Sequence, residues 1–230
     1  MTTVVLGSAS PSRLSILRSG GIEPLVVVST ADEDKLKDSL PAGPELVQEL
    51  ARCKARNVAG RLPTEHPKAA ADALVIGSDS MLLTESGDLI GKPLTVTNTI
   101  KHWQKVRGTT AQLITGHTLI RVTAGVVEEH GAQSSNYPHA EAVSSTKLFF
   151  GTPDDRDIER YARTGEPLYC AGGFTLEALG GWFIDRIEGD PSNVIGLSLP
   201  TVRRLAAELG VAATELWNIA PEMGDDQQVN

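Results

Sequence analysis

The sequence predicts an α/β protein, because short apolar runs typical of buried strands alternate with segments whose apolar residues recur at helical spacing. Its 230 residues are 40% hydrophobic, which suffices for a substantial core without disulfides or structural metals. The two cysteines, Cys53 and Cys170, lie far apart and match neither a disulfide framework nor a metal-ligand spacing. We therefore expect an ordered globular protein in a reducing compartment.

The first third of the chain is predicted as two strand–helix pairs. Residues 3–7 form a short apolar run, and Ser10 followed by Pro11 is a typical helix start, since Ser caps a helix and Pro suits its first position. That helix is predicted to end at the next pair of glycines. Residues 24–30 form a second apolar run, a carboxylate-rich loop follows, and residues 45–59 carry apolar side chains at helical spacing.

The middle of the chain is predicted to contain a loop, a long strand and a helix. Residues 60–72 contain the glycine and prolines typical of a loop. Residues 73–83 form a continuous apolar run, predicted as a buried strand, that contains one carboxylate, Asp79. After a turn, the spacing of apolar residues over 98–106 predicts a helix.

The last part of the chain begins with two long apolar runs, 112–124 and 140–150, which are predicted to pair as a hairpin. Thr152 and Pro153, followed by two acids, indicate a helix in which Thr152 is the cap and which ends near residue 165. The remaining expected elements are a glycine-rich loop over 171–181, a strand over 181–187, an amphipathic helix over 200–210 and a polar tail over 222–230. No repeat or linker divides the chain, so residues 1–221 are predicted to form one domain.

The charge balance restricts the class of partner. Lys and Arg total 21 against 29 Asp and Glu, which gives a formal net charge of −8. This argues against binding to a nucleic acid polymer, which depends on many cationic contacts, whereas a small anion needs only a few local cations. The N-terminus lacks a basic segment followed by an apolar core, and no stretch approaches 18 apolar residues. We expect a cytoplasmic protein that does not enter a membrane.

The turn from Gly7 to Arg13 is a candidate phosphate site. It connects a predicted strand to a predicted helix, and a helix N-terminus offers unpaired N–H groups and a partial positive charge. Its small residues allow a ligand to approach the backbone, and Arg13 adds a cation. The turn matches neither the Walker A pattern nor the dinucleotide-binding glycine pattern. The alternative interpretation is an ordinary capped turn without a ligand.

Asp79 is a candidate catalytic or metal-binding residue. Apolar residues flank it within its strand, so its carboxylate is desolvated unless it contacts a cation, a metal or a reacting water. Asp32 and Glu33 follow the preceding apolar run and could join it in an oxygen-rich site suited to Mg²⁺ or Mn²⁺. The alternatives are a carboxylate that caps a turn or forms an ion pair, and an acidic loop that is merely solvated.

Lys54 and Lys92 are candidate cations. Lys54 lies at the edge of the apolar stripe of its predicted helix, and Lys92 precedes a proline in a loop. Together with Arg13 they would supply three positive charges, about what a triphosphate held by one divalent ion needs. Each lysine alone is also consistent with an ordinary solvated side chain.

The glycine-rich stretch from Gly165 to Gly181 is a candidate base-binding loop. Its glycines permit backbone close to a ligand, Phe174 could pack on a base, and the Glu177 carboxylate could accept N–H donors from a guanine-like edge. The alternative is a plain glycine-rich loop with a phenylalanine in the core. Cys170 could be a thiol nucleophile, but nothing in the sequence orients a histidine toward it, and a small hydrophobic role is favoured.

Several ordered motifs make the chain resemble the Maf family of nucleoside triphosphate pyrophosphatases over nearly its whole length. The motifs are LGSASPSRLSIL, the ADE after the second apolar run, LARCKA, VIGSDS, GKP, ITGHT, YARTGEPLYCAGGF and GDPSNVIGLSLP. The resemblance implies an elongated mixed sheet flanked by helices, with a central cleft between two lobes, shared with inosine triphosphatase-like enzymes. It also implies hydrolysis of a nucleoside triphosphate to the monophosphate and pyrophosphate with a divalent metal, Mg²⁺ or Mn²⁺, and a homodimer.

The resemblance also assigns roles to single residues. Asp79 matches the aspartate taken as the general base, which would activate a water for attack at the α-phosphorus, directly or through the metal. Glu33 matches an acid near the metal, so Glu33 and Asp79 are the expected metal ligands. The expected substrate-binding residues are the cations Arg13, Lys54 and Lys92, the serines Ser8, Ser10, Ser12 and Ser80, and the loop residues Phe174 and Glu177.

Departures from two branches of the family bear on the preferred base. Relatives in the branch that hydrolyses dTTP and UTP carry Arg at position 12, Thr at 80, Lys at 170, Tyr at 174 and Gln at 177. This chain has Ser12, Ser80, Cys170, Phe174 and Glu177. The last three are similar to the branch acting on 7-methylguanosine triphosphate, although that branch carries Trp at position 12 and Gln at 80. We therefore expect guanine-type or modified nucleotides to be preferred over dTTP.

Two other functions compete with this interpretation. One is a non-catalytic regulator that binds a nucleotide or a cell-division partner, which the family's association with septum formation suggests. The presence of Asp79, Lys54 and Lys92 argues against it, because a pure binder needs no carboxylate at a desolvated position. The other is a nucleotidyltransferase that uses the same acids.

Overall fold

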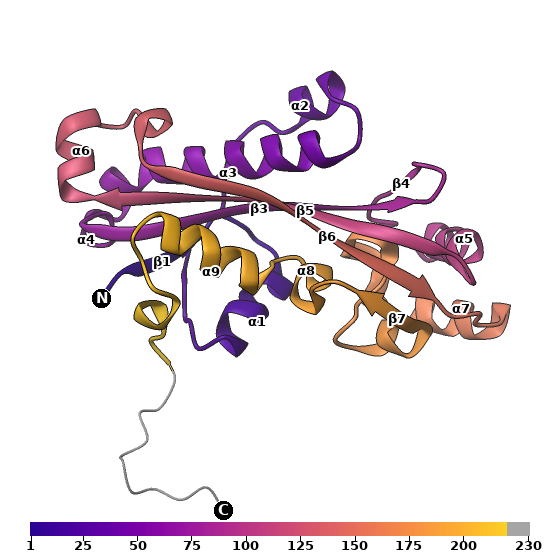
Figure 1. The fold of residues 1–230 in the computed structure, drawn as a ribbon. Coiled ribbons are helices and arrows are strands. Elements are labelled where there is room, and N and C mark those ends of the chain that lie inside the picture. The colour runs from indigo at the N-terminus through magenta and orange to yellow at the C-terminus, as the bar shows by residue number, and fades with distance from the viewer. Residues whose placement is uncertain (220–230) are drawn as a thin grey trace, which may run out of the picture.

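An elongated, mixed sheet forms the centre of the molecule, with helices on both faces (Figure 1). The computed structural model describes residues 1–219, so the predicted tail over 222–230 lies outside the described residues. The sheet has seven strands in the order β2-β1-β3-β5-β6-β7, and β4 also pairs with β3. The β1–β2 and β1–β3 pairings are parallel and the others are antiparallel. The predicted class, an α/β protein with a mixed sheet flanked by helices, is confirmed.

The elements have the following bounds. The strands are β1 (Thr3–Leu6), β2 (Leu25–Val26), β3 (Asp72–Thr84), β4 (Leu89–Ile90), β5 (Thr110–Thr123), β6 (His139–Phe150) and β7 (Ile184–Glu188). The α-helices are α1 (Pro11–Ser19), α2 (Asp34–Ser39), α3 (Pro44–Glu65), α4 (Pro67–Ala70), α5 (Val96–Val106), α6 (Ala124–His130), α7 (Asp155–Arg163), α8 (Pro191–Ile195) and α9 (Leu199–Glu208). Short 3₁₀ turns include η2 (Glu166–Tyr169), η3 (Ala171–Gly173) and η4 (Leu179–Phe183).

Helix α3 covers one face of the sheet, and α1, α8 and α9 lie on the other side (Figure 1). Two glycines allow α3 to come close. A Cβ on Gly77 of β3 would lie 2.3 Å from the carbonyl oxygen of Ala51, and one on Gly116 of β5 would lie 2.3 Å from that of Val47. A side chain at either glycine would push the helix away from the sheet.

Strand β3 has a gap in its pairing on the side of β1. The register of β1 ends at Leu6 opposite Ile76, and the Gly7 N–H donates to the Ile76 carbonyl. Strand β4 pairs with β3 only from Leu82 onward. Between these points, residues 77–81 of β3 have a strand partner on the β5 side alone, among the described residues. The gap leaves this edge of the central strand without a strand partner, and Asp79 and Ser80 within it are partly exposed.

The segment between the first and third strands departs most from the sequence prediction. The predicted strand over 24–30 is reduced to the two residues of β2, and Val26 and Val28 are exposed. The acidic loop contains the short helix α2. The predicted loop over 60–72 is wrong, because α3 continues through Pro63 to Glu65 and α4 follows. Leu62 is fully buried, so burial of one more turn of the apolar stripe outweighs the cost of Pro63.

Most other predicted elements are confirmed. The helix over 98–106 is α5, the two long runs pair as β5 and β6 with α6 between them, and the final helix is α9. The cap of α7 is Asp154 and not Thr152, because the Asp154 carboxylate accepts from the Asp157 N–H at 2.8 Å. The strand over 181–187 begins later, at Ile184, after a 3₁₀ turn. The division into two lobes around a cleft stays a prediction.

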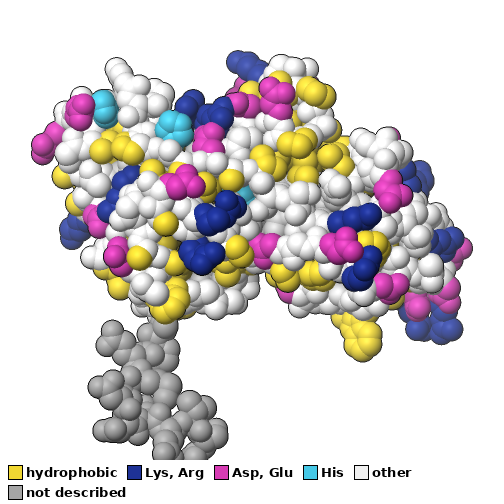
Figure 2. Space-filling model, in the orientation of Figure 1, with side chains coloured by type: hydrophobic (Ala, Val, Ile, Leu, Met, Phe, Trp, Pro, Cys, Tyr) yellow, Lys and Arg dark blue, Asp and Glu magenta, His cyan; other side chains and the backbone are white. Residues whose placement is uncertain are grey.

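Charges of both signs are interspersed over the face seen in Figure 2. This face therefore lacks the continuous basic surface that an extended polyanion would need. Within residues 1–219, no helix combines the length and the apolar character that crossing a membrane requires.

Candidate functional site

Asp79 lies in the gap of β3 and contacts a lysine from α3. Side chains alternate along a strand, so Asp79 shares the α3-facing side with Gly77, two residues earlier. The Lys54 ammonium donates to Asp79 Oδ1 at 2.6 Å and lies 3.2 Å from Glu33 Oε1. The side chains of Lys54, Asp79 and Glu33 are 11%, 18% and 29% exposed. One partly desolvated ammonium thus joins the two carboxylates predicted to hold a metal.

Arg13 supplies a second cation from the opposite side of the strand. Its guanidinium donates to the Gly196 carbonyl at 2.9 Å, to Ser8 Oγ at 3.1 Å and to Ser80 Oγ at 3.2 Å. All these acceptors are uncharged, and no carboxylate of the described residues lies within ion-pair distance of this guanidinium. Burial lowers its pKa, and the charges of Asp79 and Glu33 act in the opposite direction. A buried cation without an anionic partner is unfavourable by itself, which suits a site that receives an anion.

The turn before α1 is held in place by its own hydroxyls. Ser10 caps the helix by accepting from the Arg13 N–H, as predicted, and Ser8 Oγ accepts from the Ser10 N–H at 3.2 Å. Ser12 lies half-buried in the first turn of the helix. The turn therefore places Ser8 and the N-terminus of α1 beside the Arg13 guanidinium.

A chain of hydrogen bonds continues from Arg13 into the core. Ser80 Oγ, which accepts from Arg13, lies 2.9 Å from Thr115 Oγ1. Asn193 is fully buried, and its amide donates to the Leu113 carbonyl and to Thr146 Oγ1. These contacts tie the α8 segment, and with it the Gly196 carbonyl that Arg13 contacts, to the sheet. Thr115 and Asn193 are not among the predicted site residues, and the only signal for them in the sequence is their place in the ITGHT and GDPSNVIGLSLP motifs.

His117 is a fully buried histidine that attaches α9 to the sheet. Its Nε2 accepts from the Ser198 N–H at 2.9 Å, so the neutral ring carries its proton on Nδ1, which lies 3.1 Å from the Thr115 carbonyl. Burial, followed by the charge of Arg13, lowers the pKa of His117 to about 4. Protonation would place a donor against the Ser198 N–H and break this contact.

The lowered pKa predicts a loss of stability in acid. The unfolded chain takes up a proton near pH 6.5, whereas the folded His117 takes it up only near pH 4. The contribution of the neutral His117 to the free energy of unfolding is therefore complete above pH 6.5 and is lost as the pH falls toward 4. Its size is about 3 kcal/mol. We expect the stability difference between wild type and His117→Gln, measured by urea unfolding, to shrink by about that amount between pH 7.5 and 4.5. Parallel pH profiles of the two proteins would contradict the assignment.

The remaining predicted substrate residues lie near the 166–180 segment. Lys92 is exposed, and its charge opposes the rise in the pKa of the Cys170 thiol that burial, Glu177 and Glu166 cause. Glu177 is exposed. Phe174 is 4% exposed and packs edge-to-face on Phe150, so its ring belongs to the core in this conformation, as the alternative interpretation expected.

Cys170 does not have the features of a nucleophile. Burial, followed by the charges of Glu177 and Glu166, raises the pKa of its thiol. The thiol lies 3.6 Å from the Glu166 carbonyl, a weak donor contact. A raised pKa lowers the thiolate fraction on which nucleophilic attack depends.

Glu33 and Asp79 fit a hard divalent cation that arrives with a phosphate ligand. The described residues contain no group of three or more His, Cys, Asp or Glu side chains arranged to hold a metal. Mg²⁺, however, is commonly held by one or two carboxylates together with waters and substrate phosphates, and not by a complete protein cage. The two carboxylates that converge on Lys54 provide such a partial set of oxygen ligands.

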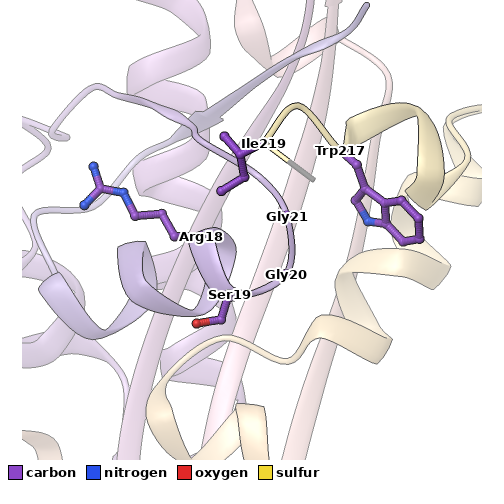
Figure 3. A pocket seen from close by; sticks show the side chains of 6 residues that line it. All are labelled: Arg18, Ser19, Gly20, Gly21, Trp217 and Ile219. Carbon is purple, nitrogen blue, oxygen red and sulfur yellow. The ribbon is translucent and has the colours of Figure 1, made fainter. Parts of the chain in front are cut away.

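A surface pocket elsewhere contains none of these residues. It lies at the C-terminal end of α1 and is lined by Arg18, Ser19, Gly20, Gly21, Trp217 and Ile219 (Figure 3). Arg18 forms an ion pair with Glu23 at 2.7 Å, and Figure 3 shows its side chain pointing away from Trp217. The pocket offers neither a carboxylate nor an unpaired cation, so it is not a second copy of the polar site on β3.

Fold and site together define a class of protein: an α/β protein in which two cations and two carboxylates, from α1, α3, β3 and the N-cap of α2, lie around an unpaired stretch of the central strand, an arrangement suited to a phosphate-bearing ligand. The match to known families is more specific. The family described as Maf-like protein matches residues 3–209, and the chain belongs to this family. The matched range includes the four charged residues of the candidate site, Arg13, Glu33, Lys54 and Asp79.

Curated relatives match over nearly their whole length. A protein of Rhodococcus opacus named "Nucleoside triphosphate pyrophosphatase" is 50% identical over 220 residues, covering 94% of this chain and 97% of the relative. A protein of Corynebacterium diphtheriae with the same name is 52% identical over 219 residues, covering 94% and 98%. Among solved structures, a HAM1 protein from Coxiella burnetii covers 65% of this chain and 73% of its own, with 15% identity and a TM-score of 0.39.

Proposed function

We propose that this protein hydrolyses a nucleoside triphosphate to the nucleoside monophosphate and pyrophosphate. The observation that carries the proposal is the buried guanidinium of Arg13, which has no carboxylate partner and contacts Ser80, the residue next to the Lys54-paired Asp79 in β3. The names of the curated relatives support the same reaction. A phosphate chain would supply the anion that Arg13 lacks.

The formal charges of the site explain why a metal would accompany the nucleotide. Arg13 and Lys54 balance Asp79 and Glu33, so the free site has no net formal charge. A triphosphate would add about four negative charges, and a divalent cation halves that excess. Glu33 and Asp79 would hold the cation, Mg²⁺ or Mn²⁺, which supplies charge neutralisation at the phosphates and lowers the pKa of a bound water.

The residues of the chain then have separate tasks. Arg13 and Lys54 bind the phosphate oxygens and stabilise the charge that develops on the leaving pyrophosphate. Ser8, Ser10 and Ser12 line the turn beside Arg13, and Lys92 adds an exposed cation from its loop. Asp79 accepts the proton of the water that attacks the α-phosphorus.

The exposed Glu177 carboxylate supports a preference for guanine-type bases. A carboxylate pairs with two adjacent N–H donors, which guanine offers and thymine does not. We therefore propose guanine-type or modified nucleotides, such as 7-methylguanosine triphosphate, as substrates over dTTP and UTP. A homodimer in the cytoplasm completes the proposal, and light scattering of the purified protein tests the dimer.

A substrate panel tests this function. Pyrophosphate release, coupled to an inorganic pyrophosphatase, is measured for GTP, 7-methyl-GTP, dTTP and UTP with and without Mg²⁺ or Mn²⁺. The proposal expects metal-dependent release, with a guanine-type nucleotide fastest. Absence of release from every nucleotide would favour a non-catalytic regulator, transfer of the nucleotide to another acceptor would favour a nucleotidyltransferase, and dTTP as the fastest substrate would overturn the base preference.

The position of Lys54 predicts that it competes with the metal when no nucleotide is present. Its ammonium lies between the two carboxylate oxygens that the cation would need. Replacing Lys54 with Met leaves them without a counter-ion, so Mn²⁺ should bind the nucleotide-free protein about tenfold more tightly. Electron paramagnetic resonance of free Mn²⁺ measures this affinity.

Lys37 offers a matched control for that experiment. It lies 3.6 Å from the other oxygen of Glu33 but is about half exposed. Lys37→Met makes the same change of net charge, and solvent screening should keep its effect on Mn²⁺ affinity below about twofold. Equal effects of both substitutions, or weaker binding in Lys54→Met, would show that Lys54 does not occupy the metal position.

A further inference from the structure

Glu166 is a carboxylate that the proposed reaction does not use, yet it gathers an unusual number of donors. Its Oε1 accepts from the Tyr161 hydroxyl at 3.2 Å and from the Gly180 N–H at 3.1 Å, and its Oε2 accepts from the Leu179 N–H at 3.3 Å. The Thr175 hydroxyl also donates to Oε1. One side chain in η2 thus accepts from both ends of the segment 175–180.

These contacts close the segment 175–180 into a loop. Thr175 enters it and Gly180 leaves it, and a Cβ on Gly180 would lie 2.5 Å from both the Thr175 carbonyl oxygen and the Tyr161 hydroxyl. The Thr175 N–H also donates to the Tyr161 hydroxyl at 3.2 Å. Glu177 lies between the two tethered ends and is exposed.

The glycine turn before this loop lies against the strand that carries the catalytic residue. A Cβ on Gly172 would lie 2.6 Å from Leu82 Cδ2, and the Trp103 indole donates to the Gly173 carbonyl at 2.9 Å. Leu82 lies two residues after Ser80 on the same face of β3, about 7 Å along the strand, and Ser80 accepts from the Arg13 guanidinium. A nucleotide with its phosphates at Arg13 can therefore extend its base along this face toward the segment.

We propose that Glu166 is a positioning residue for base selection: it fixes the loop 175–180 so that the Glu177 carboxylate faces the N–H donors of a guanine-type base. The proposal rests on the proposed function, in which Glu177 contacts the base. Because the loop is already fixed, Glu177 loses little conformational freedom when the base binds. Its carboxylate is therefore preorganised for the base.

The test compares kcat/KM for pyrophosphate release from 7-methyl-GTP and from dTTP. In Glu166→Gln, the side-chain amide presents N–H groups toward some of the loop donors, so the tethers are lost while the size is kept. The ratio of the two kcat/KM values should fall by about tenfold, mainly through a higher KM for 7-methyl-GTP, because an oriented pair of hydrogen bonds to a base is lost. The kcat/KM for dTTP itself should change by less than about threefold.

The double variant separates positioning from general structural support. If Glu166 acts through Glu177, Glu166→Gln should not lower the ratio further in a Glu177→Gln background. Glu159→Gln is the matched control, because Glu159 lies on the adjacent helix α7, is about half exposed and pairs with Arg163. This variant should leave the ratio unchanged.

Three results would overturn the proposal: an unchanged ratio in Glu166→Gln, an equal loss for both nucleotides, or an additive loss in the double variant. If Glu166→Gln does not fold by circular dichroism, Thr175→Val removes one donor, keeps the carboxylate and should lower the ratio in the same direction. An unchanged ratio in Thr175→Val would then overturn the proposal. Failure of the proposed function is distinct, because it appears as absent pyrophosphate release in the wild type.

Discussion

Asp79→Asn is expected to lower kcat for pyrophosphate release by at least about 100-fold, because the variant loses the group that accepts the proton of the attacking water. The amide has nearly the same size and can still contact Lys54, so the gap in β3 keeps its shape. Nucleotide affinity, measured by calorimetry without the divalent cation so that no turnover occurs, should stay within about threefold of the wild type. The substitution thus separates catalysis from binding.

Asp72→Asn is the matched control. Asp72 is the first residue of the same strand, β3, and forms an ion pair with Arg121 there. It makes the same change of charge, and its kcat should stay within about twofold of the wild type once thermal stability has been checked. An Asp79→Asn enzyme with wild-type turnover, or an equal loss in Asp72→Asn, would remove Asp79 from the reaction.

Arg13→Met is expected to lower kcat/KM by about 100- to 1,000-fold, the usual effect of removing a preorganised group that stabilises developing charge. The guanidinium has no carboxylate partner to leave unpaired, so stability should change by less than about 2 kcal/mol in urea unfolding. A large loss of activity with little loss of stability is the expected signature.

Arg18→Met controls for the loss of an arginine from α1. Arg18 is on the same helix, is exposed and pairs with Glu23, far from the carboxylates of the site. Its activity should stay within about twofold of the wild type. If the activity of Arg13→Met fell only in proportion to the fraction of folded protein, Arg13 would be a structural residue. Its proposed role in binding phosphate would then be wrong.

Local signals in the sequence predicted much of the site. Ser10 and Pro11 defined the start of α1, and the single carboxylate in an apolar strand singled out Asp79. The helical stripe correctly placed Lys54 on the face of α3 that meets the sheet. The positions of these residues could be predicted because each depends on chemistry within one element, whereas their roles in a reaction stay predictions.

Contacts between distant segments could not be predicted in the same way. Arg13 bonds to the Gly196 carbonyl, 183 positions away, and Glu166 accepts from donors of a loop that the sequence marked only as glycine-rich. The helical prediction stopped before Leu62 because Gly60 and Pro63 suggested a loop, whereas burial against the sheet stabilises the extra turn. Composition also could not decide that the Phe174 ring packs on Phe150 and not on a ligand.

Hydrolysis of a guanine-type nucleoside triphosphate in ¹⁸O-labelled water tests the central claim most directly. If water attacks the α-phosphorus beside Asp79, ³¹P nuclear magnetic resonance should show monophosphate and pyrophosphate in equal amounts, with the label in the monophosphate. Release of orthophosphate with a nucleoside diphosphate, or label in the pyrophosphate, would contradict the account.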